Sequence, residues 1–365
     1  MNPARSWKRD RALFESKSKK LFYREFQYQK KDMARFLAEA HGFDVLYRES
    51  RDPETKRTKF FFFTETLRDL IYLLKRRSLI KSYDHILALW HSGLAFMLLR
   101  RLGIIDYDKL LWFGFSVHSP FWGRIYRQIA KLDRDHTWFV VFTEQEIEEY
   151  STSFGIDPSR LLFVAHGDWP QPIDVPDVFR PDPAFDLTIP FYFAGGFTNR
   201  DYRPIIESFE KLGHRLIIVC SQTNEDVIDD ELPENVQAYR DIPFADFELL
   251  IQASKAVIIP LKRDAGAAGH SVLVRSMRNG KIIVANDFRI IHDYVDDGVD
   301  GVLVKNMTDE LVSVIDEIER HPDRFAPVQR AALKRFEREY SQQALERTMS
   351  NLIQDQWIGA PQTSA

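Results

Sequence analysis

The stretch AVIIPLKRDAGAAGHSVLVRSMRNGKIIVA, residues 256–285, says most about the architecture of this chain. It opens on an apolar run at 256–261, passes through a loop of small residues and continues into an amphipathic pattern at 271–278. A second apolar run, 281–285, follows directly. Parallel strands need a long crossover, usually a helix, so this pattern predicts a strand–helix–strand unit. The segment therefore predicts an α/β domain with a parallel sheet.

The same alternation continues on both sides of this segment. Further strands are expected at 191–194, 215–220, 236–239 and 301–304. Helices are expected at 204–211, 245–252, 290–295, 308–319, 327–340 and 342–353. Strands that alternate with helices in this way form a doubly wound sheet, and ligands of such sheets bind at the carboxyl ends of the strands.

The N-terminal half repeats the pattern ahead of a proline-rich linker. Its expected strands are 21–25, 43–47, 59–63, 86–90, 110–115 and 138–142, with helices at 31–40, 65–76 and 94–101. Six prolines from Gly167 to Pro190 then exclude both a helix and a central strand. We therefore predict two Rossmann-like doubly wound domains, 1–175 and 176–340, facing a cleft, and a C-terminal helix within 341–365 that crosses back to the first domain.

The composition limits the classes of function. A formal net charge of -4 argues against a dedicated nucleic-acid binder. The single cysteine, Cys220, excludes an internal disulfide and a Cys-cluster zinc site, so we expect a reducing compartment. The charged N-terminus carries no recognisable secretory signal, and the longest apolar run, 86–99, is too short to span a bilayer. We therefore expect a cytoplasmic protein, and no metal-ligand or Walker motif suggests another class.

Basic residues gather in the N-terminal half, at 6–31, 75–77 and 100–101. One interpretation is an ordinary solvated surface. The other is a basic face that approaches an anionic substrate or rests on anionic lipid, which would make the protein peripheral to the inner membrane.

The loop at 260–271 is the strongest candidate for a ligand site. Gly269, His270 and Ser271 stand where the loop passes into the helix. The first turn of a helix offers unpaired N–H groups and the positive end of its dipole, and this combination binds phosphate. The alternative is that the glycines serve only a tight strand-to-helix turn.

A second candidate loop follows the strand at 191–194. Gly195 and Gly196 open space there, and Arg200 supplies a permanent cation with a planar fork of donors. Arg200 and Lys262 are expected on the same edge of the sheet, where together they could neutralise a diphosphate. The alternative is a surface arrangement of Arg200 and Asp201 with no ligand.

Taken in order, these segments resemble GT-B glycosyltransferases, and most closely the retaining family-4 group. The resemblance is carried by 194–202, 239–243, 253–260 and 269–285, and it covers about 191–305 well but the N-terminal half only loosely. In that family the last segment is a small-residue loop, a helix ending in Ala-Met-x-x-Gly-Lys, and a strand. Here the corresponding letters are SMRNGK, residues 276–281.

The resemblance implies transfer of a sugar from a UDP- or GDP-linked donor to an acceptor hydroxyl. The basic N-terminal face motivates the hypothesis that the acceptor is a glycan or lipid-linked intermediate of bacterial polysaccharide or envelope glycan synthesis. The resemblance also implies a retaining reaction with no cofactor beyond the donor. The absence of an Asp-x-Asp metal motif at a strand end favours a reaction that needs no metal. Arg200 and Lys262 would balance the donor charge, and the backbone around Ile242 and Pro243 would line the base pocket. Backbone contacts to the diphosphate would come from the start of the helix: Gly269, His270 and Ser271.

This sequence departs from the family pattern at two positions. Many members carry two glutamates eight positions apart, and the second normally binds the ribose hydroxyls; here these positions hold Ala267 and Arg275. Arg275 cannot accept a hydrogen bond from a hydroxyl. Either the ribose is held differently, or Arg275 contacts phosphate, or donor binding is impaired. A non-catalytic GT-B partner subunit that binds a nucleotide or glycan, and a GT-B sugar-nucleotide epimerase or phosphorylase, therefore stay open as alternatives.

In the N-terminal half, His118 follows the expected strand 110–115 within the letters GFSVHSP, residues 114–120. In the family a histidine at a similar place contacts the transferred sugar, so His118 is the candidate catalytic residue. His91 and Glu144, which also follow expected strands, are competing candidates. The alternative for His118 is a capping or packing role in the loop.

Overall fold

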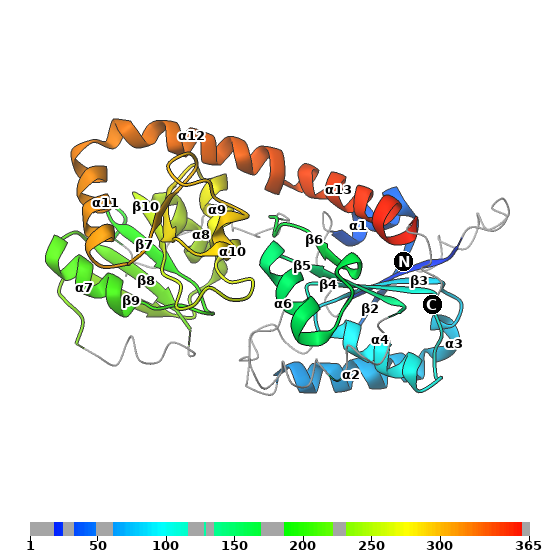
Figure 1. The fold of residues 1–365 in the computed structure, drawn as a ribbon. Coiled ribbons are helices and arrows are strands. Elements are labelled where there is room, and N and C mark those ends of the chain that lie inside the picture. The colour runs from blue at the N-terminus through cyan, green and yellow to red at the C-terminus, as the bar shows by residue number, and fades with distance from the viewer. Residues whose placement is uncertain are drawn as a thin grey trace, which may run out of the picture.

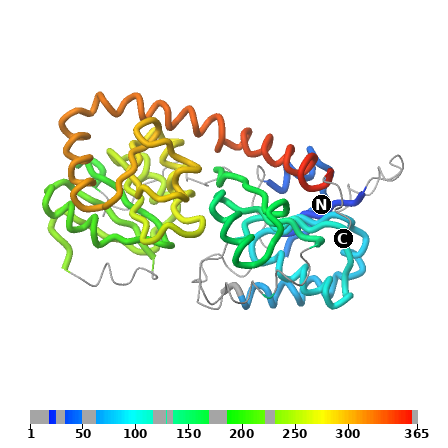
Figure 2. The backbone as a smooth tube through the Cα atoms, in the orientation of Figure 1, coloured from blue at the N-terminus to red at the C-terminus, as the bar shows by residue number. Residues whose placement is uncertain are grey.

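The computed structural model describes residues 18–24, 33–48, 61–115, 128, 135–168, 186–221 and 231–359. These residues form two α/β units, each built on a six-stranded sheet (Figure 1). A long helical segment near the C-terminus runs from the second unit back to the first (Figure 2). The predicted fold class of two Rossmann-like domains is confirmed.

The N-terminal sheet has the strand order β2-β1-β3-β4-β5-β6, and every pair of neighbours is parallel. Its strands are β1 (Lys20–Arg24), β2 (Phe43–Tyr47), β3 (His85–Leu89), β4 (Lys109–Phe113), β5 (Thr137–Val141) and β6 (Leu161–Phe163). Its helices are α1 (Met33–His41), α2 (Phe61–Lys75), α3 (Arg77–Ile80), α4 (Ser92–Arg101) and α6 (Glu144–Phe154), with a short 3-10 turn, η2 (Pro158–Arg160). The central strands are buried along most of their length, because helices cover both faces of the sheet.

The C-terminal sheet has the order β12-β11-β10-β7-β8-β9 and is also parallel throughout. Its strands are β7 (Tyr192–Gly195), β8 (Leu216–Cys220), β9 (Val236–Arg240), β10 (Ala256–Ile259), β11 (Ile282–Asn286) and β12 (Val302–Val304). Its helices are α7 (Arg203–Leu212), α8 (Phe244–Ala253), α9 (His270–Arg278), α10 (Arg289–His292) and α11 (Asp309–Arg320), followed by the turn η4 (Pro322–Phe325). Each predicted strand of this half begins and ends within two residues of its observed position.

The N-terminal half differs more from the prediction. The strand predicted at 59–63 is wrong, because Phe61 to Phe63 already belong to helix α2. Four consecutive phenylalanines, 60–63, favour a strand locally, but the carboxylates that follow them form tertiary contacts with Arg48 from a helix. The sequence analysis also missed β6 and α6, although Thr143 caps α6 through Glu146 N and so gave a recognisable start signal. His118 and the predicted domain boundary at 175/176 lie outside the described residues.

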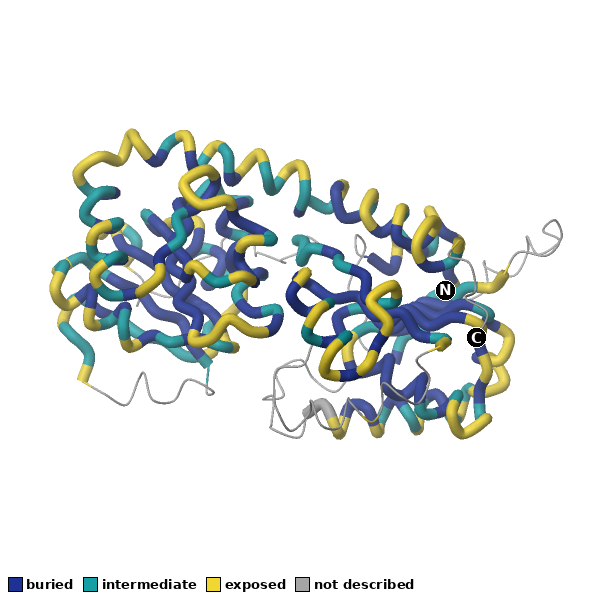
Figure 3. The backbone as a smooth tube through the Cα atoms, viewed as in Figure 1, coloured by how far each residue is buried: buried dark blue, intermediate teal, exposed yellow. Residues whose placement is uncertain are grey.

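Each sheet has a hydrophobic core on both of its faces (Figure 3). In the C-terminal domain one core packs β-strand side chains such as Phe193 against α8 and α9, and the other packs residues such as Ile218 against α7 and α11. Buried apolar area of this kind is the main source of stability in such domains.

The C-terminal helices connect the two domains. Helix α12 (Ala326–Arg335) contributes Ala332 to a core of the second domain, and a π-helical turn, η5 (Phe336–Tyr340), follows it. At Ser341 the backbone turns to φ -64 and ψ 159, and its side chain caps α13 (Gln342–Asn351). Helix α13 and the final turn η6 (Leu352–Ile358) then pack on the first domain through Met349, Leu352, Ile353 and Trp357.

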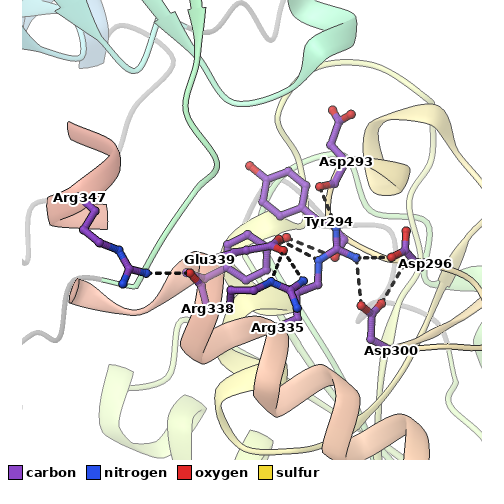
Figure 4. Close-up of polar contacts among 9 residues, drawn as sticks. Asp293, Tyr294, Asp296, Asp300, Arg335, Arg338, Glu339 and Arg347 are labelled. Carbon is purple, nitrogen blue, oxygen red and sulfur yellow. Dashed lines mark hydrogen bonds and ion pairs between the residues drawn. The ribbon is translucent and has the colours of Figure 1, made fainter. Parts of the chain in front are cut away.

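Arg335 holds the end of α12 against the second domain (Figure 4). Its guanidinium lies 2.9 Å from Asp300 Oδ2, 3.1 Å from Asp296 Oδ2 and 3.0 Å from Glu339 Oε2. Tyr340, which ends the π-helical turn, stacks on Tyr294 with ring centroids 5.5 Å apart. The bend at Ser341 is therefore fixed on its C-terminal-domain side, and the chain leaves for the other domain from an anchored position.

Trp357 is the main anchor at the other end of this crossing. Its ring stacks on Phe43, with centroids 6.3 Å apart, and its carbonyl oxygen accepts a hydrogen bond from Lys109 Nζ at 2.7 Å. We expect Trp357→Ala to lower the free energy of unfolding by about 3–5 kcal/mol, because it removes a fully buried aromatic side chain and leaves a cavity. Urea unfolding followed by fluorescence measures this, with the exposed Gln356→Ala as the control. Equal stability of the two variants would contradict the anchoring role.

Candidate functional site

The order in which the chain adds strands to the C-terminal sheet reverses between the neighbouring strands β7 and β10. From β7 the chain builds β8 and β9 on one side, and it then returns to build β10, β11 and β12 on the other. The connections that leave β7 and β10 therefore go to opposite faces of the sheet and leave a crevice at the strand ends, where ligands of doubly wound sheets bind. Both loops that the sequence singled out, after β7 and after β10, lie at this switch point.

The two loops are joined by main-chain contacts. Lys262 N donates to Asn199 O at 3.2 Å, and Asp201 N donates to the Pro260 carbonyl oxygen at 3.0 Å. Asn199 Nδ2 also donates to Arg263 O at 2.8 Å. The two predicted loops thus form one structural unit, which keeps the side chains of both at fixed positions.

Arg200 lies at the centre of this unit and is only 7% exposed. Its Nε donates to Gly195 O at 3.3 Å and its Nη1 donates to Thr198 O at 2.7 Å, whereas Nη2 has no acceptor among the described residues. No carboxylate of the described chain forms an ion pair with it, and burial lowers its pKa below the ordinary value. Arginine nevertheless stays protonated in proteins, so the site holds a buried positive charge that no described residue neutralises.

Gly196 makes room for this guanidinium, and Gly269 lies next to it. Gly196 has φ +139, and a Cβ there would come within 2.3 Å of Arg200 Nη2. Gly269 has φ +89, and a Cβ there would lie 3.9 Å from Arg200 Nη1. Arg200 therefore sits directly beside the residue that precedes helix α9, and neither glycine tolerates a side chain without strain.

Gly269 is the N-cap of α9 and has no side chain with which to cap the helix. Within the described chain, no hydrogen-bond acceptor is found for the amides of His270 and Ser271. Uncapped amides and the helix dipole give a positive potential at this end of α9. Together with Arg200, they form an arrangement suited to an anion such as a phosphate.

His270, the first residue of α9, is buried and neutral. Its Nε2 lies 2.9 Å from Ile290 O, and because a carbonyl oxygen can only accept, Nε2 carries the proton. Nδ1 is therefore an acceptor, and it is buried without a partner among the described residues. The ring stacks on Tyr294 with centroids 4.2 Å apart. A buried acceptor at the opening of α9 is consistent with a hydroxyl donor of a ligand at this position.

The N-terminal domain reaches the same region through the ends of β5 and β6. The Tyr294 hydroxyl donates to Phe142 O and accepts from His166 N, both at 2.7 Å. Gln145 Nε2 donates to Asp264 O, in the loop after β10, at 3.2 Å. His166 is a second histidine whose Nδ1 is buried without a partner in the described part of the chain. The sequence analysis did not identify His166, because it follows the strand that was missed.

Arg275 lies one turn and a half further along α9 and faces α8. Its Nε is 3.1 Å from Glu248 Oε1, and its guanidinium stacks over the Phe244 ring at 4.5 Å. Glu248 also forms an ion pair with Arg278, which in turn pairs with Asp168 of the interdomain segment. Burial raises the pKa of Glu248, and the two arginines oppose that rise. Glu248, which the sequence analysis did not select, thus brings a carboxylate beside Arg275.

The other predicted residues are more scattered. Ile242 is half-buried and Pro243 is exposed at the N-cap of α8, so both border the β9–α8 loop. The side chain of Lys262 is exposed in the β10–α9 loop. Among the competing candidates, Glu144 is exposed at the start of α6, and its main-chain N donates to Asp293 Oδ2 at 2.9 Å.

His91, the remaining competing candidate, belongs to a polar cluster in the first domain. Its Nε2 lies 3.4 Å from Asp69 Oδ2. The Asp69 carboxylate also accepts hydrogen bonds from Tyr23, Arg48 and Ser92 at 2.5–2.8 Å. Those partners give Asp69 and His91 a role in holding α2 and α4 to the sheet.

The fold of the chain is shared with solved structures at low sequence identity. No protein-family model and no curated protein sequence matches the chain. Sucrose-phosphate synthase from Thermosynechococcus elongatus is 14% identical with a TM-score of 0.64, covering 93% of this chain and 99% of that chain. Anabaena Alr3699/HepE in complex with UDP and glucose is 14% identical with a TM-score of 0.62, covering 92% and 99%. A Listeria monocytogenes protein, provisionally assigned as a UDP-N-acetylglucosamine 2-epimerase, is 13% identical with a TM-score of 0.53, covering 93% and 96%. This chain therefore has the two-domain GT-B fold.

The two buried histidines predict a dependence of stability on pH. Burial lowers the pKa of His270 to about 3 and that of His166 to about 4, from 6.5. Between those values and 6.5 the unfolded chain binds protons that the folded chain does not. Their stabilising contribution is therefore complete above about pH 6.5 and declines as the pH falls, by about 1.4 kcal/mol per unit and per histidine.

Urea unfolding between pH 7.5 and 4.5 tests this dependence. We expect His270→Gln to show a shallower loss of stability toward acid than the wild type, since Gln keeps a donor for Ile290 O without titrating. The exposed His321→Gln serves as the control and is expected to follow the wild type. Parallel curves for all three proteins would contradict the assignment of a buried neutral His270.

Proposed function

We propose that the protein is a glycosyltransferase that binds a nucleoside diphosphate sugar at the switch point of its C-terminal sheet and transfers the sugar to an acceptor hydroxyl. The observation that carries the proposal is Arg200, a buried cation with no carboxylate partner among the described residues, beside the uncapped start of α9. A charge in this setting is costly unless a ligand neutralises it. A diphosphate supplies two negative charges and acceptor oxygens that suit an arginine fork.

The same groups account for catalysis in this proposal. Negative charge grows on the leaving diphosphate as the sugar bond breaks, and preorganised donors at that point lower the barrier. Arg200, the amides of His270 and Ser271, and the exposed Lys262 are the donors. Tyr294 of the second domain bonds to Phe142 of the first, and Gln145 of the first domain bonds to Asp264 of the second. These contacts bring strand ends of the N-terminal domain beside the loop after β10, which helps to exclude water from the reacting centre.

Glu248 takes over the role of the carboxylate that the family carries at position 275. Its Oε1 is buried 3.1 Å from Arg275 Nε, and it accepts no hydrogen bond from a described residue. A carboxylate oxygen in this state can accept a hydrogen bond from a ribose hydroxyl. Arg275 then fixes Glu248 instead of binding the ribose itself. The departure at position 275 is in this way compatible with donor binding.

Two other functions are compatible with this fold and must be excluded by experiment. An epimerase of this fold would interconvert two nucleotide sugars with no net release of nucleoside diphosphate, and a non-catalytic subunit would bind without turnover. The Listeria neighbour, given its provisional assignment, is the reason to test the first of these. Release of nucleoside diphosphate only when an acceptor glycan or lipid-linked glycan is present supports the transferase, and NMR of the product tests the retention that the sequence resemblance implies.

Replacing Arg200 tests the diphosphate site. We expect Arg200→Met to weaken binding of UDP, GDP and inorganic pyrophosphate by roughly 10- to 100-fold, since a charge-assisted hydrogen bond contributes about 1.5–3 kcal/mol. Uridine and guanosine binding should be little changed, because they lack the diphosphate. Calorimetry measures the affinities, and the exposed Arg320→Met on α11 is the control. Equal losses for nucleoside and nucleoside diphosphate would reject the role given to Arg200.

A double comparison tests Glu248. In the wild-type protein, 2′-deoxy-UDP is expected to bind about tenfold more weakly than UDP, because the carboxylate loses a hydrogen-bond partner. In Glu248→Leu, which has no acceptor, the two ligands should bind with nearly equal affinity, while pyrophosphate binding stays unchanged. Isothermal calorimetry on both proteins gives the coupling free energy between Glu248 and the ribose 2′-hydroxyl. If the penalty for the missing hydroxyl were the same in both proteins, Glu248 would not contact the ribose.

A further inference from the structure

Helix α2 buries two carboxylates on one face and exposes three large apolar side chains on the opposite face, whereas Leu73 near its end is buried in the core. The carboxylates of Glu65 and Asp69 are buried and pair with Arg48, which follows β2 and is itself buried. Arg48 Nη2 lies 2.7 Å from Glu65 Oε2, and Arg48 Nε lies 2.5 Å from Asp69 Oδ1. A buried arginine needs carboxylates from a neighbouring element, so it fixes which face of α2 turns inward.

The opposite face of α2 carries a row of apolar side chains. Phe63 is 59% exposed, and Leu67 and Ile71 are each 47% exposed. The spacing of four residues places them along one line of the helix surface. Figure 3 shows that the helix runs along an outer edge of the N-terminal domain and that exposed and buried residues alternate along it. Contiguous exposed apolar residues of this kind mark an interaction surface.

A basic cluster continues this row at the C-terminal end of α2. Lys75, Arg77 and Lys81 are exposed, and no carboxylate of the described chain forms an ion pair with them. Helix α4 packs beside α2 and ends in the exposed Arg101 and Leu102. Positive charge that no described carboxylate pairs with therefore lies at one end of the apolar row. The exposed apolar side chain of Leu102 lies among these basic residues.

We propose that this face, Phe63, Leu67 and Ile71 with Lys75, Arg77 and Lys81, docks on the surface of a membrane that contains anionic lipid. A row of large apolar side chains next to lysine and arginine is typical of helices that lie in the interface between headgroups and acyl chains. The charge complementarity favours lipid over a protein partner, because the cores of protein interfaces are depleted in lysine. Within the described chain, no helix is long and apolar enough to cross a membrane.

This inference does not depend on the donor site. It deepens the proposed function in one respect, because a protein docked in this way meets lipid-linked acceptors in the plane of the membrane. Nucleotide binding and membrane binding are separate measurements, so the failure of one proposal leaves the other open to its own test.

The test is co-sedimentation of the full chain with vesicles of phosphatidylglycerol and phosphatidylcholine, and with vesicles of phosphatidylcholine alone. We expect binding to the anionic vesicles that weakens as salt screens the basic cluster. The triple variant Phe63→Ser, Leu67→Ser, Ile71→Ser should lower the partition coefficient by roughly tenfold or more. The double variant Lys75→Glu, Arg77→Glu should lower it similarly and remove the salt dependence.

Two controls complete the experiment. Ile189→Ser with Val299→Ser removes exposed apolar side chains of the other domain and should bind vesicles as the wild type does. Circular dichroism and UDP affinity should be unchanged in all variants. Equal vesicle binding by the wild type and the triple variant, or no binding to anionic vesicles, would overturn the proposal. Self-association in sedimentation velocity that the triple variant abolishes, without vesicle binding by the wild type, would overturn it in favour of a second copy of the chain.

Discussion

The arrangement of the two domains depends most directly on the two hydrogen bonds of the Tyr294 hydroxyl. It donates to Phe142 O at the end of β5 and accepts from His166 N after β6, so one buried phenol bonds to the main chain at two strand ends of the other domain. The ring of the same residue stacks between His270 and Tyr340. The start of α9, the bend in the crossing helices and the edge of the N-terminal sheet therefore meet at a single side chain, and each restricts the position of the others.

Two buried arginines differ in the counter-charge that the fold gives them. Arg48 is matched by the carboxylates of Glu65 and Asp69, and this internal pairing fixes the orientation of α2. Arg200 has carbonyl oxygens around it but no carboxylate within the described residues. Since both are shielded from water, the difference lies in the counter-charge. The first arginine is neutralised by carboxylates of the fold, whereas the second has no counter-charge among the described residues.

Part of the candidate site could be predicted from the sequence. The glycines around Arg200 and at the start of α9 belong to local strand–loop–helix segments, and local segments can be recognised without knowing what they pack against. Glu248 and His166 could not be recognised in this way, because each comes from an element whose position beside α9 depends on packing across the domain. The three phenylalanines at the start of α2 were misjudged for the same reason, since α2 is held by the pairing of its Glu65 and Asp69 with Arg48 of another element.

The sequence by itself determined the two alternating α/β patterns, the position of nearly every strand in the C-terminal half and the loop residues at its switch point. These features follow from hydrophobic periodicity and from glycine, both of which act over a few neighbouring residues. Only the tertiary structure decided that α2 turns apolar side chains to solvent, that Glu248 stands beside Arg275 and that Tyr294 joins the domains. Such contacts pair residues distant in the chain, and burial and charge compensation select them only after the sheets have formed.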